Sequence, residues 1–383
     1  MDEFKDIRCF DNEEVHDVLV RLSNEKPFMK VLSTIYPLMP KDILKQKLST
    51  FNTKYDFQKE MVVPFLQYLE ANLTKGVDLN GLNKIDVTKS QLYISNHRDI
   101  ILDSAFLCGK LVENNLDTVE IAIGDNLLIF PWIEDLVKVN KSFIVKRGLS
   151  PRHILESSQK LSAYINYTIN KKNQSIWIAQ REGRAKDAND RTQESLLKMF
   201  NMYGTGDFIE NISALNLCPL SISYEYDPCD FLKAKEMQQR RDNPEFTKSP
   251  TDDLINMETG VMGYKGKVVY EITGNISQEL KLIAAQTSKR NEQIALTAQL
   301  IDKRIYANYN IFACNKIAYD YYLEDKKFEK EYTVEEKNAF EKYLSFQIAK
   351  IELENKDEKF IHSKMIEMYA NPLINKLKTT SDL

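Results

Sequence analysis

The stretch QLYISNHRDIILDSAF, residues 91–106, contains the two patterns that decide the fold. Residues 91–95 form a short apolar, β-rich run, which is typical of a buried strand. The residues that follow His97 have the character of a helix, with Asp99 and Asp103 near its start. The stretch therefore predicts one strand and one helix of an α/β sheet, with a histidine where they join.

The same alternation extends in both directions from this stretch, over residues 81–320. Short β-rich runs are separated by amphipathic helical stretches, which is the signature of an α/β sheet. The runs are QLYIS, VEIAI, SFIV, SIWIA, LSISY and KVVYEI. We predict an α/β fold with a mixed, largely parallel sheet flanked by helices, and with N-terminal and C-terminal helical additions.

Three regions are predicted along the chain. Residues 1–80 have helical spacing and little strand signal, so they form an N-terminal helical region. Residues 81–320 form the catalytic domain, and the charge-dense residues 321–383 form a C-terminal helical segment. The polar stretch RRDNPEFTKSPTDD, residues 240–253, is the part of the sequence that most resembles a linker.

Composition limits the protein class. The chain has 383 residues, 43% of them hydrophobic, which suffices for a sizeable core. Its longest uncharged run, residues 211–224, is too short and too polar to cross a bilayer, and the N-terminus does not have the pattern of a secretory signal. The five cysteines are odd in number and scattered, which favours reduced thiols. We expect a cytoplasmic protein.

Charge is distributed unevenly. The formal net charge is −4, but residues 138–191 contain 12 basic and four acidic residues. A basic segment in an acidic chain favours a local anionic ligand over a nucleic-acid surface, which is usually basic across a whole domain. Charge alone does not exclude a merely solvated helix face.

Polar side chains follow four of the predicted strands. These groups are His97, the pair Lys146 and Arg147, the run 181–184, and Glu225. In an open α/β sheet, ligands bind beyond the carboxyl ends of parallel strands. The four groups would therefore meet at one crevice if their strands run parallel, whereas an antiparallel strand would carry its group to the other side.

Four ordered motifs over residues 91–227 resemble those of the glycerolipid acyltransferases, the family of glycerol-3-phosphate and 1-acylglycerol-3-phosphate (lysophosphatidate) acyltransferases. The family patterns are NHxxxxD, a strand ending in FIxR, EGxR after an apolar strand, and a proline that opens a strand. The corresponding segments here are NHRDIILD, KSFIVKR, REGR and CPLSISYEY. The first motif departs from the family spacing, because position 102 is Leu102 and the carboxylates are at Asp99 and Asp103.

The chemistry of acyl transfer explains why such residues are needed. An alcohol must lose its proton as it attacks a thioester, and a neutral histidine is suited to accept it, so His97 is the candidate general base. A carboxylate on the other ring nitrogen fixes the tautomer and stabilises the imidazolium, a role for Asp103 or, failing it, Asp99. On a helix beginning near Arg98, both carboxylates would share one face.

The resemblance also implies a substrate site. Arg147, Glu182, Gly183 and Arg184 would form the acceptor site, with Lys146 beside them, because guanidinium groups match phosphate geometry and glycine permits close backbone approach. Pro219 belongs to the fourth motif and is counted with these substrate-binding residues, while its exact part in catalysis stays open. The implied donor is acyl-CoA or acyl carrier protein, and the implied acceptor is a phosphate-bearing lipid. No metal, no other cofactor and no nucleic acid is expected.

Plainer explanations remain for several of these residues. Asp99 is also suited to be only a helix cap, His97 a structural histidine, Lys146 and Arg147 a strand-end charge pair, and Pro219 an edge-strand residue. The other histidines lack metal-ligand spacing. A lipid product implies peripheral contact with the inner face of the cytoplasmic membrane. Residues 126–133, NLLIFPWI, are a candidate for that contact or for an acyl channel, although ordinary core is favoured.

Two other functions are compatible with the same residues. One is O-acylation of another lipid, such as an N-acyl amino-acid lipid. The other is a catalytically silent protein that binds lipid or phosphate. A histidine with an acid nearby favours an enzyme over the silent protein.

Overall fold

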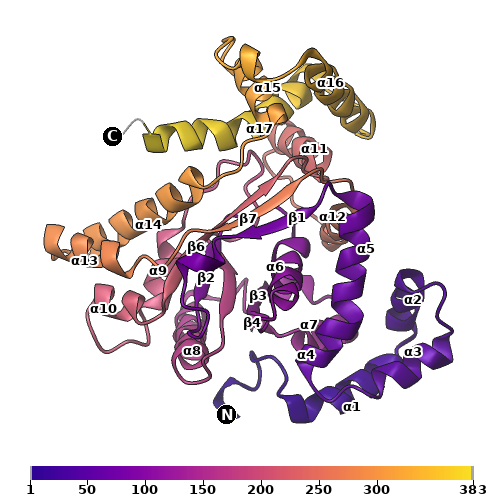
Figure 1. Ribbon diagram of the computed structural model, residues 1–383, viewed down its shortest axis with the longest axis vertical. Helices are drawn as coiled ribbons and strands as arrows, with labels where there is room; N and C mark the ends of the chain where they lie inside the picture. The colour runs from indigo at the N-terminus through magenta and orange to yellow at the C-terminus, as the bar shows by residue number, and fades with distance from the viewer. Residues whose placement is uncertain (1, 381–383) are drawn as a thin grey trace.

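The computed structural model describes residues 2–380, and within them seven strands form one sheet in the order β1-β7-β6-β2-β5-β3-β4 (Figure 1). The strands are β1 Val77–Asn80, β2 Leu92–Ser95, β3 Glu120–Gly124, β4 Ser142–Val145, β5 Ile176–Ala179, β6 Leu217–Tyr224 and β7 Val268–Ile272. The predicted α/β class with a largely parallel sheet is confirmed.

The direction of the strands divides the sheet in two. Strands β2 to β6 run parallel to one another, with Leu92 of β2 level with both Ile176 of β5 and Leu217 of β6. Strand β7 is antiparallel to β6, and β1 is parallel to β7. The six predicted β-rich runs correspond to β2 through β7, whereas β1 lies within residues 1–80 and was not predicted.

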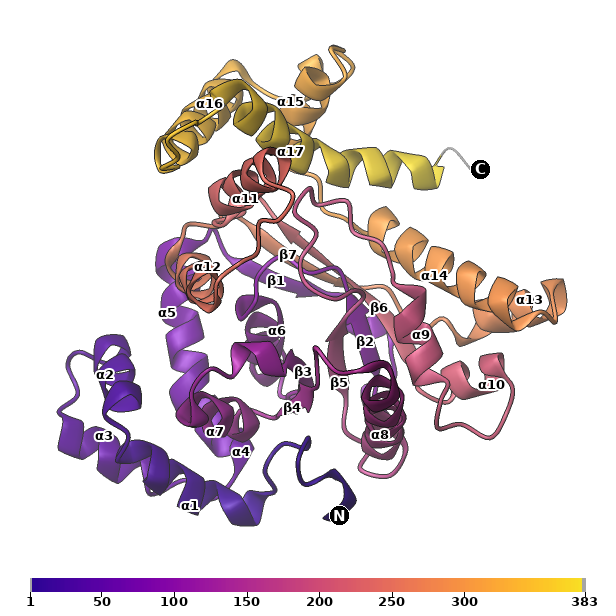
Figure 2. The same cartoon turned by 180° about the vertical axis from the view of Figure 1, so that it is seen from behind.

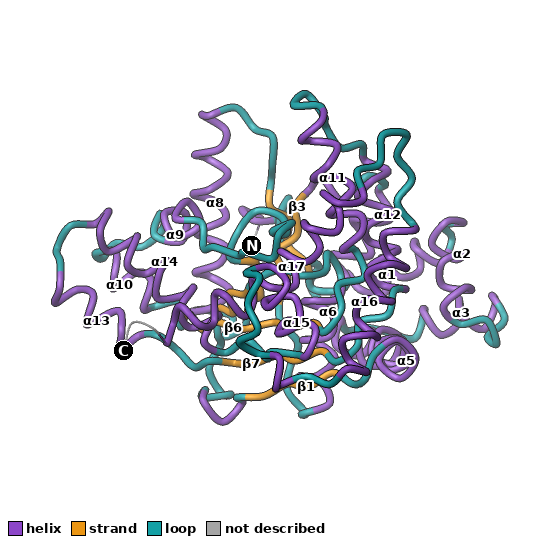
Figure 3. Tube along the Cα trace, turned by 90° about the horizontal axis from the view of Figure 1, so that it is seen from above, coloured by secondary structure: helices purple, strands orange, loops and turns teal. Residues whose placement is uncertain are grey.

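Helices cover both faces of the sheet (Figure 3). The helices up to β4 are α1 Asn12–Ser23, α2 Lys26–Ile35, α3 Lys41–Leu48, α4 Lys54–Phe57, α5 Val63–Leu73, α6 Leu102–Glu113 and α7 Pro131–Val139. Those between β4 and β7 are α8 Pro151–Asn170, α9 Glu194–Phe200, α10 Phe208–Ser213, α11 Asp230–Asp242 and α12 Pro250–Met262. Those after β7 are α13 Ser277–Gln286, α14 Arg290–Ala307, α15 Ala313–Tyr322, α16 Val334–Ala349 and α17 Glu358–Thr380.

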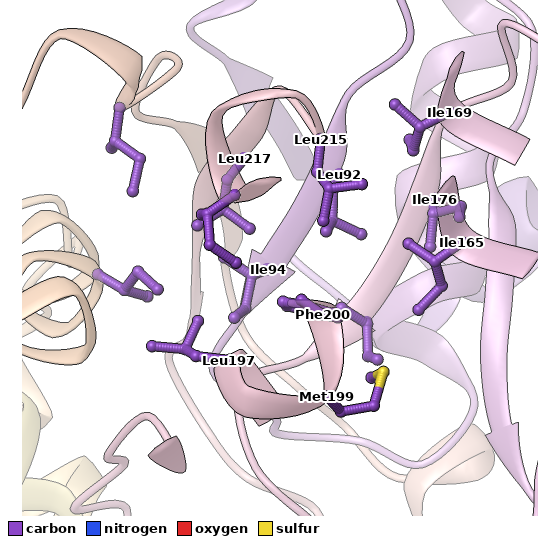
Figure 4. Packing of buried hydrophobic residues seen from close by; sticks show 14 of the residues in the cluster. Leu92, Ile94, Ile165, Ile169, Ile176, Leu197, Met199, Phe200, Leu215 and Leu217 are labelled. Atoms are coloured by element: carbon purple, nitrogen blue, oxygen red, sulfur yellow. The ribbon is translucent and has the colours of Figure 1, made fainter. Parts of the chain in front are cut away.

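The two faces of the sheet have separate apolar cores, because successive side chains of a strand point to opposite faces. Leu92 and Ile94 of β2 pack with residues of α8, α9, α10 and α14, as Figure 4 shows for part of this cluster. Tyr93, between them, packs on the other face with α5 and α6. This sandwich fixes β2 in the middle of the sheet and holds its carboxyl end rigidly.

The N-terminal and C-terminal helices pack on different parts of this framework. Helices α1 to α4 share an apolar cluster with Val139, Trp132 and Leu136 of α7. Helices α15 to α17 share another with α11 and lie at the upper end of the molecule in Figure 1. The charge-dense C-terminal segment is therefore helical and docked, as expected.

A capping box starts α16 within this charge-dense segment. The Thr333 hydroxyl accepts a hydrogen bond from the Glu336 N–H (3.1 Å), and the Glu336 carboxylate accepts one from the Thr333 N–H (2.8 Å). These two bonds satisfy N–H groups that have no partner inside the helix.

All five cysteines are buried, and each lies in a different part of the fold. Cys9 precedes α1, Cys108 lies in α6, Cys218 in β6, Cys229 just before α11, and Cys314 in α15.

Candidate active site

The carboxyl ends of β2, β4 and β5 open onto one large cavity. The strands run parallel, so the loops that follow them leave the sheet at the same edge. The cavity has a volume of about 1730 Å³, and its wall includes His97, Arg147 and the residues 181–184. The structure therefore brings together three of the four polar groups that follow predicted strands.

His97 and Asp103 form a hydrogen-bonded pair at the junction of β2 and α6. His97 Nδ1 lies 2.8 Å from Oδ2 of Asp103. Asp103 is fully buried, while 13% of the His97 side chain is exposed. A carboxylate only accepts hydrogen bonds, so Nδ1 carries the hydrogen of the neutral ring and Nε2 is the proton acceptor.

The environment holds this pair in place. Oδ2 of Asp103 also accepts hydrogen bonds from the backbone N–H groups of Arg98 (2.6 Å) and Asp99 (3.1 Å). The carboxylate therefore fixes the loop that carries the histidine. On the other side, the rings of His97 and Trp177 meet edge to face, with their centroids 5.6 Å apart. The imidazole is therefore oriented by both a carboxylate and an aromatic ring.

Asp99 accepts hydrogen bonds from other groups than Asp103 does. Its Oδ1 accepts the backbone N–H groups of Ile101 (2.9 Å) and Leu102 (2.8 Å), which is helix-capping geometry. Burial, and next the nearby Asp103 charge, raise the pKa of Asp99 above its ordinary value. The expectation that a helix begins near Arg98 was wrong: α6 begins at Leu102, so only Asp103 of the two lies in the helix.

Most of the cavity wall is apolar. Side chains from α2, the π-helical turn Gln58–Val62, α5, α6, α7 and β3 line it, as do residues of α8, α9 and α12. Asn126, Leu127, Trp132 and Ile133 are also in the wall. The expectation of ordinary core for residues 126–133 was wrong for most of the stretch, because none of these eight residues is buried and only Trp132 of them packs against the apolar cluster of α1 to α4.

Arg147 is held at the end of β4. Its Nη1 lies 3.3 Å from Oε1 of Glu182, and its backbone N–H donates to Oδ1 of Asp125 (3.1 Å). The guanidinium packs against Gly124, where any Cβ would lie only 2.6 Å from Nε of Arg147. Lys146 is exposed and also lines the cavity.

Gly183 and Arg184 differ sharply in their surroundings. Gly183 is exposed and has a φ of +66°, a backbone conformation that favours glycine. Arg184 turns inward, and its Nη2 donates to Oδ1 of Asn256 in α12 (2.9 Å). Arg184 is only 8% exposed, yet it lines the cavity.

Two residues that the sequence singled out, Pro219 and Glu225, do not line the cavity. Pro219 is buried inside β6, level with Ile94 of β2, so it is neither a cavity residue nor an edge-strand residue. Its carbonyl accepts hydrogen bonds from Thr273. Glu225 follows β6 as expected, but its carboxylate lies 2.9 Å from Nζ of Lys75, away from the cavity wall.

A charged part of the cavity wall was not predicted from the sequence. Lys186, Glu236, Arg240 and Lys248 line the cavity, and two of them lie in the stretch 240–253 that resembles a linker. That stretch is instead the end of α11, a loop and the start of α12, which Figure 2 shows beside α5. The alternating charges of this stretch were the one feature of the sequence that could have indicated the cavity wall. A charge pattern alone does not distinguish a cavity wall from a solvated loop.

Residues 2–380 lack a metal-binding cluster and a membrane-spanning helix. No group of three or more His, Cys, Asp or Glu side chains in this range is arranged to hold a metal ion. In the same range, no helix has both the length and the apolar character needed to cross a bilayer.

Comparison with known proteins finds a likeness in structure but not in sequence. No family model matches the chain, and no curated protein matches it. The chain is similar to the crystal structure of the 1-acyl-sn-glycerophosphate (LPA) acyltransferase from Thermotoga maritima. The alignment has 11% sequence identity and a TM-score of 0.37, and covers 76% of this chain and 95% of that chain. A likeness at this level does not establish a family for the chain.

Proposed function

We propose that the protein is an O-acyltransferase that moves a fatty acyl group from a thioester donor, acyl-CoA or acyl carrier protein, to a hydroxyl of glycerol 3-phosphate or lysophosphatidate. The observation that carries the proposal is the pairing of His97 with buried Asp103 at the wall of a large, mostly apolar cavity that also contains Arg147. A base, an acyl-sized apolar space and a phosphate-binding cation are the three parts that this reaction needs.

In the proposed reaction, the acceptor hydroxyl attacks the thioester carbonyl carbon while Nε2 of His97 takes its proton. Asp103 stabilises the imidazolium that forms and keeps Nδ1 protonated. When the tetrahedral intermediate collapses, the C–S bond breaks and the imidazolium returns the proton to the leaving sulfur. The products are an ester and a free thiol, and His97 is again neutral.

Different parts of the cavity are suited to bind the acceptor phosphate and the acyl chain. Arg147 and Lys146 lie at the end of β4 and are suited to bind the phosphate of the acceptor, because charge-assisted hydrogen bonds to phosphate are strong. The apolar walls from α2, α5 and α7 are suited to bind the acyl chain.

Contact with a lipid surface is part of this proposal. Val31 of α2, Ile154 of α8, and Leu254 and Met262 of α12 line the cavity and are each between 37% and 55% exposed. Apolar side chains that are both exposed and grouped at a cavity support interaction with lipid more than they support an ordinary solvated surface.

The decisive experiment measures thiol release from acyl-CoA, and product formation from an acyl carrier protein donor, with glycerol 3-phosphate and with lysophosphatidate as acceptors. The wild type should transfer acyl groups, and His97→Ala should lower kcat about 10²- to 10⁴-fold while remaining folded. His362→Ala is the matched control, because this histidine is exposed on α17. Equal activity of the wild type and a folded His97→Ala variant would refute the mechanism.

A further inference from the structure

A second group of cations lines the same cavity and comes from other elements than Arg147, which follows β4. Lys186 follows β5, Arg240 lies in α11, and Lys248 lies in the loop before α12. All three contact one carboxylate, that of Glu236 in α11. The contacts are 2.6 Å from Lys186 Nζ, 3.1 Å from Arg240 Nε and 3.2 Å from Lys248 Nζ.

The positive charge in this group exceeds the negative charge that faces it. Three cations share Glu236, and the second acidic contact is a longer one, 3.4 Å from Lys248 Nζ to Oδ1 of Asp253. Burial would raise the pKa of Glu236, but Lys186 and Lys248 outweigh it and lower that pKa. Burial lowers the pKa of Lys186 to about 8, and repulsion by Lys248 and Arg184 adds to this effect against the attraction of Glu236.

A neighbouring guanidinium group supplies an independent observation. Arg184 lines the cavity and is 8% exposed, and its buried Nη1 has no hydrogen-bond partner in the described part of the chain. A buried charged donor without a partner costs free energy, which an anionic ligand would recover. Crowded cations and an unpaired guanidinium nitrogen together indicate a binding site for an anion.

We propose that Lys186, Arg240 and Lys248 form a second anion subsite, which binds a phosphate group of the acyl donor. This inference rests on the proposed function. The acceptor carries one phosphate, which the first subsite at Arg147 binds. The phosphopantetheine arm of both thioester donors carries another, and coenzyme A has additional phosphates. Two phosphate-bearing substrates in one cavity require two cationic subsites, and Arg147 after β4 and the cations around Glu236 would supply one each.

The kinetic test uses the double variant Arg240→Met/Lys248→Met, which removes two charges and keeps Lys186 with Glu236. We expect the KM for acyl-CoA to rise about tenfold or more, with a much smaller change in the KM for glycerol 3-phosphate. Two single variants at position 248 are then compared. Lys248→Met should raise the KM for acyl-CoA, whereas Lys248→Arg keeps the charge and should leave that KM close to the wild-type value. Lys235→Met is the matched control, since Lys235 also lies in α11 but is not in the cavity wall.

A rise in the acceptor KM instead of the donor KM would overturn the assignment, because the subsite would then bind the acceptor phosphate. Melting temperatures of all variants separate a lost contact from a lost fold. Salt provides a further check, since screening should raise the donor KM more steeply in the wild type than in the double variant.

Direct binding separates this inference from the proposed reaction. Calorimetry with the wild type should show coenzyme A and 4′-phosphopantetheine binding at least about tenfold more tightly than pantetheine, which lacks the phosphate. The double variant should lose this difference. If the wild type prefers the phosphorylated compounds but transfers no acyl group, the subsite stands and the proposed function fails. If the wild type binds all three equally, the inference fails whatever the activity.

Discussion

Asp103 receives three hydrogen bonds on one oxygen, from His97 Nδ1 and from the backbone N–H groups of Arg98 and Asp99. The carboxylate thus orients the imidazole and also fixes the loop that carries it. Asp99, four residues earlier, accepts hydrogen bonds from the backbone N–H groups of Ile101 and Leu102 at the start of α6. The two carboxylates are neighbours in sequence but act on different partners.

This difference gives the first prediction. Asp103→Asn should lower kcat by about two to four orders of magnitude, because an amide does not hold the required tautomer or stabilise the imidazolium, while the acceptor KM should change little. Asp99→Asn should keep most of the activity, since Asn and Asp are similarly good caps. Steady-state kinetics and melting temperatures of both variants check this. A severe loss of kcat in Asp99→Asn alone would show that Asp99, and not Asp103, orients His97.

A second prediction concerns Arg147. Arg147→Ala should raise the KM for a phosphate-bearing acceptor about tenfold or more, because a charge-assisted hydrogen bond is lost, and should change the donor KM less. Arg152→Ala is a suitable control, since the Arg152 side chain is 88% exposed and contacts only Glu156 among the ion pairs of the described residues. Equal increases in both Michaelis constants would contradict the assignment of Arg147 to the acceptor.

Sequence reasoning identified His97 and two candidate acids, but the choice between the acids depended on where α6 begins. A helix starting near Arg98 would have offered both carboxylates to the ring. The bonds from Asp99 and Asp103 to backbone N–H groups keep residues 97–101 out of the helix, which starts at Leu102. Such local side-chain competition with the helix is not visible in the spacing of residues alone.

At the scale of elements, β-rich runs with buried side chains were the predictable part. Strands β2, β4, β5 and β6 are buried along most of their length, β3 is buried at its two ends, and their apolar runs gave clear signals. Strand β1, VDLN, has two polar residues in four and was missed, because its pairing with β7 at the sheet edge is a tertiary contact. The cavity wall formed by α11 and α12 was missed for the same reason.

Asp230, at the start of α11, joins that helix to the C-terminal segment. Its Oδ2 accepts hydrogen bonds from the hydroxyls of Tyr343 in α16 (2.8 Å) and Tyr369 in α17 (2.7 Å). Its Oδ1 accepts one from Nε2 of Gln347 (2.6 Å). The site is fully buried, and burial, with the nearby Asp227 charge, raises the pKa of Asp230 to about 7.

The third prediction follows from this raised pKa. Between the unfolded value of 3.8 and the folded value of about 7, the native state binds a proton that the unfolded state does not. This contribution to stability is fully present below pH 4 and is lost as the pH rises towards 7, at up to about 1.4 kcal/mol per pH unit. Urea unfolding from pH 4 to pH 8 should show the loss in the wild type and a weaker pH dependence in Asp230→Asn. Parallel profiles for the two proteins would contradict it.

At the scale of the whole molecule, the cavity is assembled from residues as distant in sequence as Pro27 and Met262. Its rim combines exposed apolar side chains from α2, α8 and α12, which no local pattern connects. The stretch 126–133 was interpreted as core because it is mostly apolar, but Leu127, Trp132 and Ile133 line the cavity between elements.

The fourth prediction tests contact with lipid. Val31→Asp/Ile154→Asp should bind zwitterionic phospholipid vesicles at least several-fold more weakly than the wild type in a sedimentation assay, because two exposed apolar groups at the rim become charged. Val334→Asp/Phe346→Asp is the matched control, with two exposed apolar residues on α16. Figure 1 shows α16 at the upper end of the molecule and α2 well below it, at the right-hand side. Equal weakening in both double variants would exclude a specific lipid-facing rim.

Alkylation of the five buried cysteines would report local opening of the native protein. Burial raises the pKa of Cys9 and Cys108 to about 11 and that of Cys218 and Cys229 to about 12, and it also raises the pKa of Cys314. A thiol reagent at neutral pH therefore meets few thiolates and little access while the chain stays folded. Mass-spectrometric timing of alkylation at each position would show which part of the fold opens first, with no label introduced into the chain.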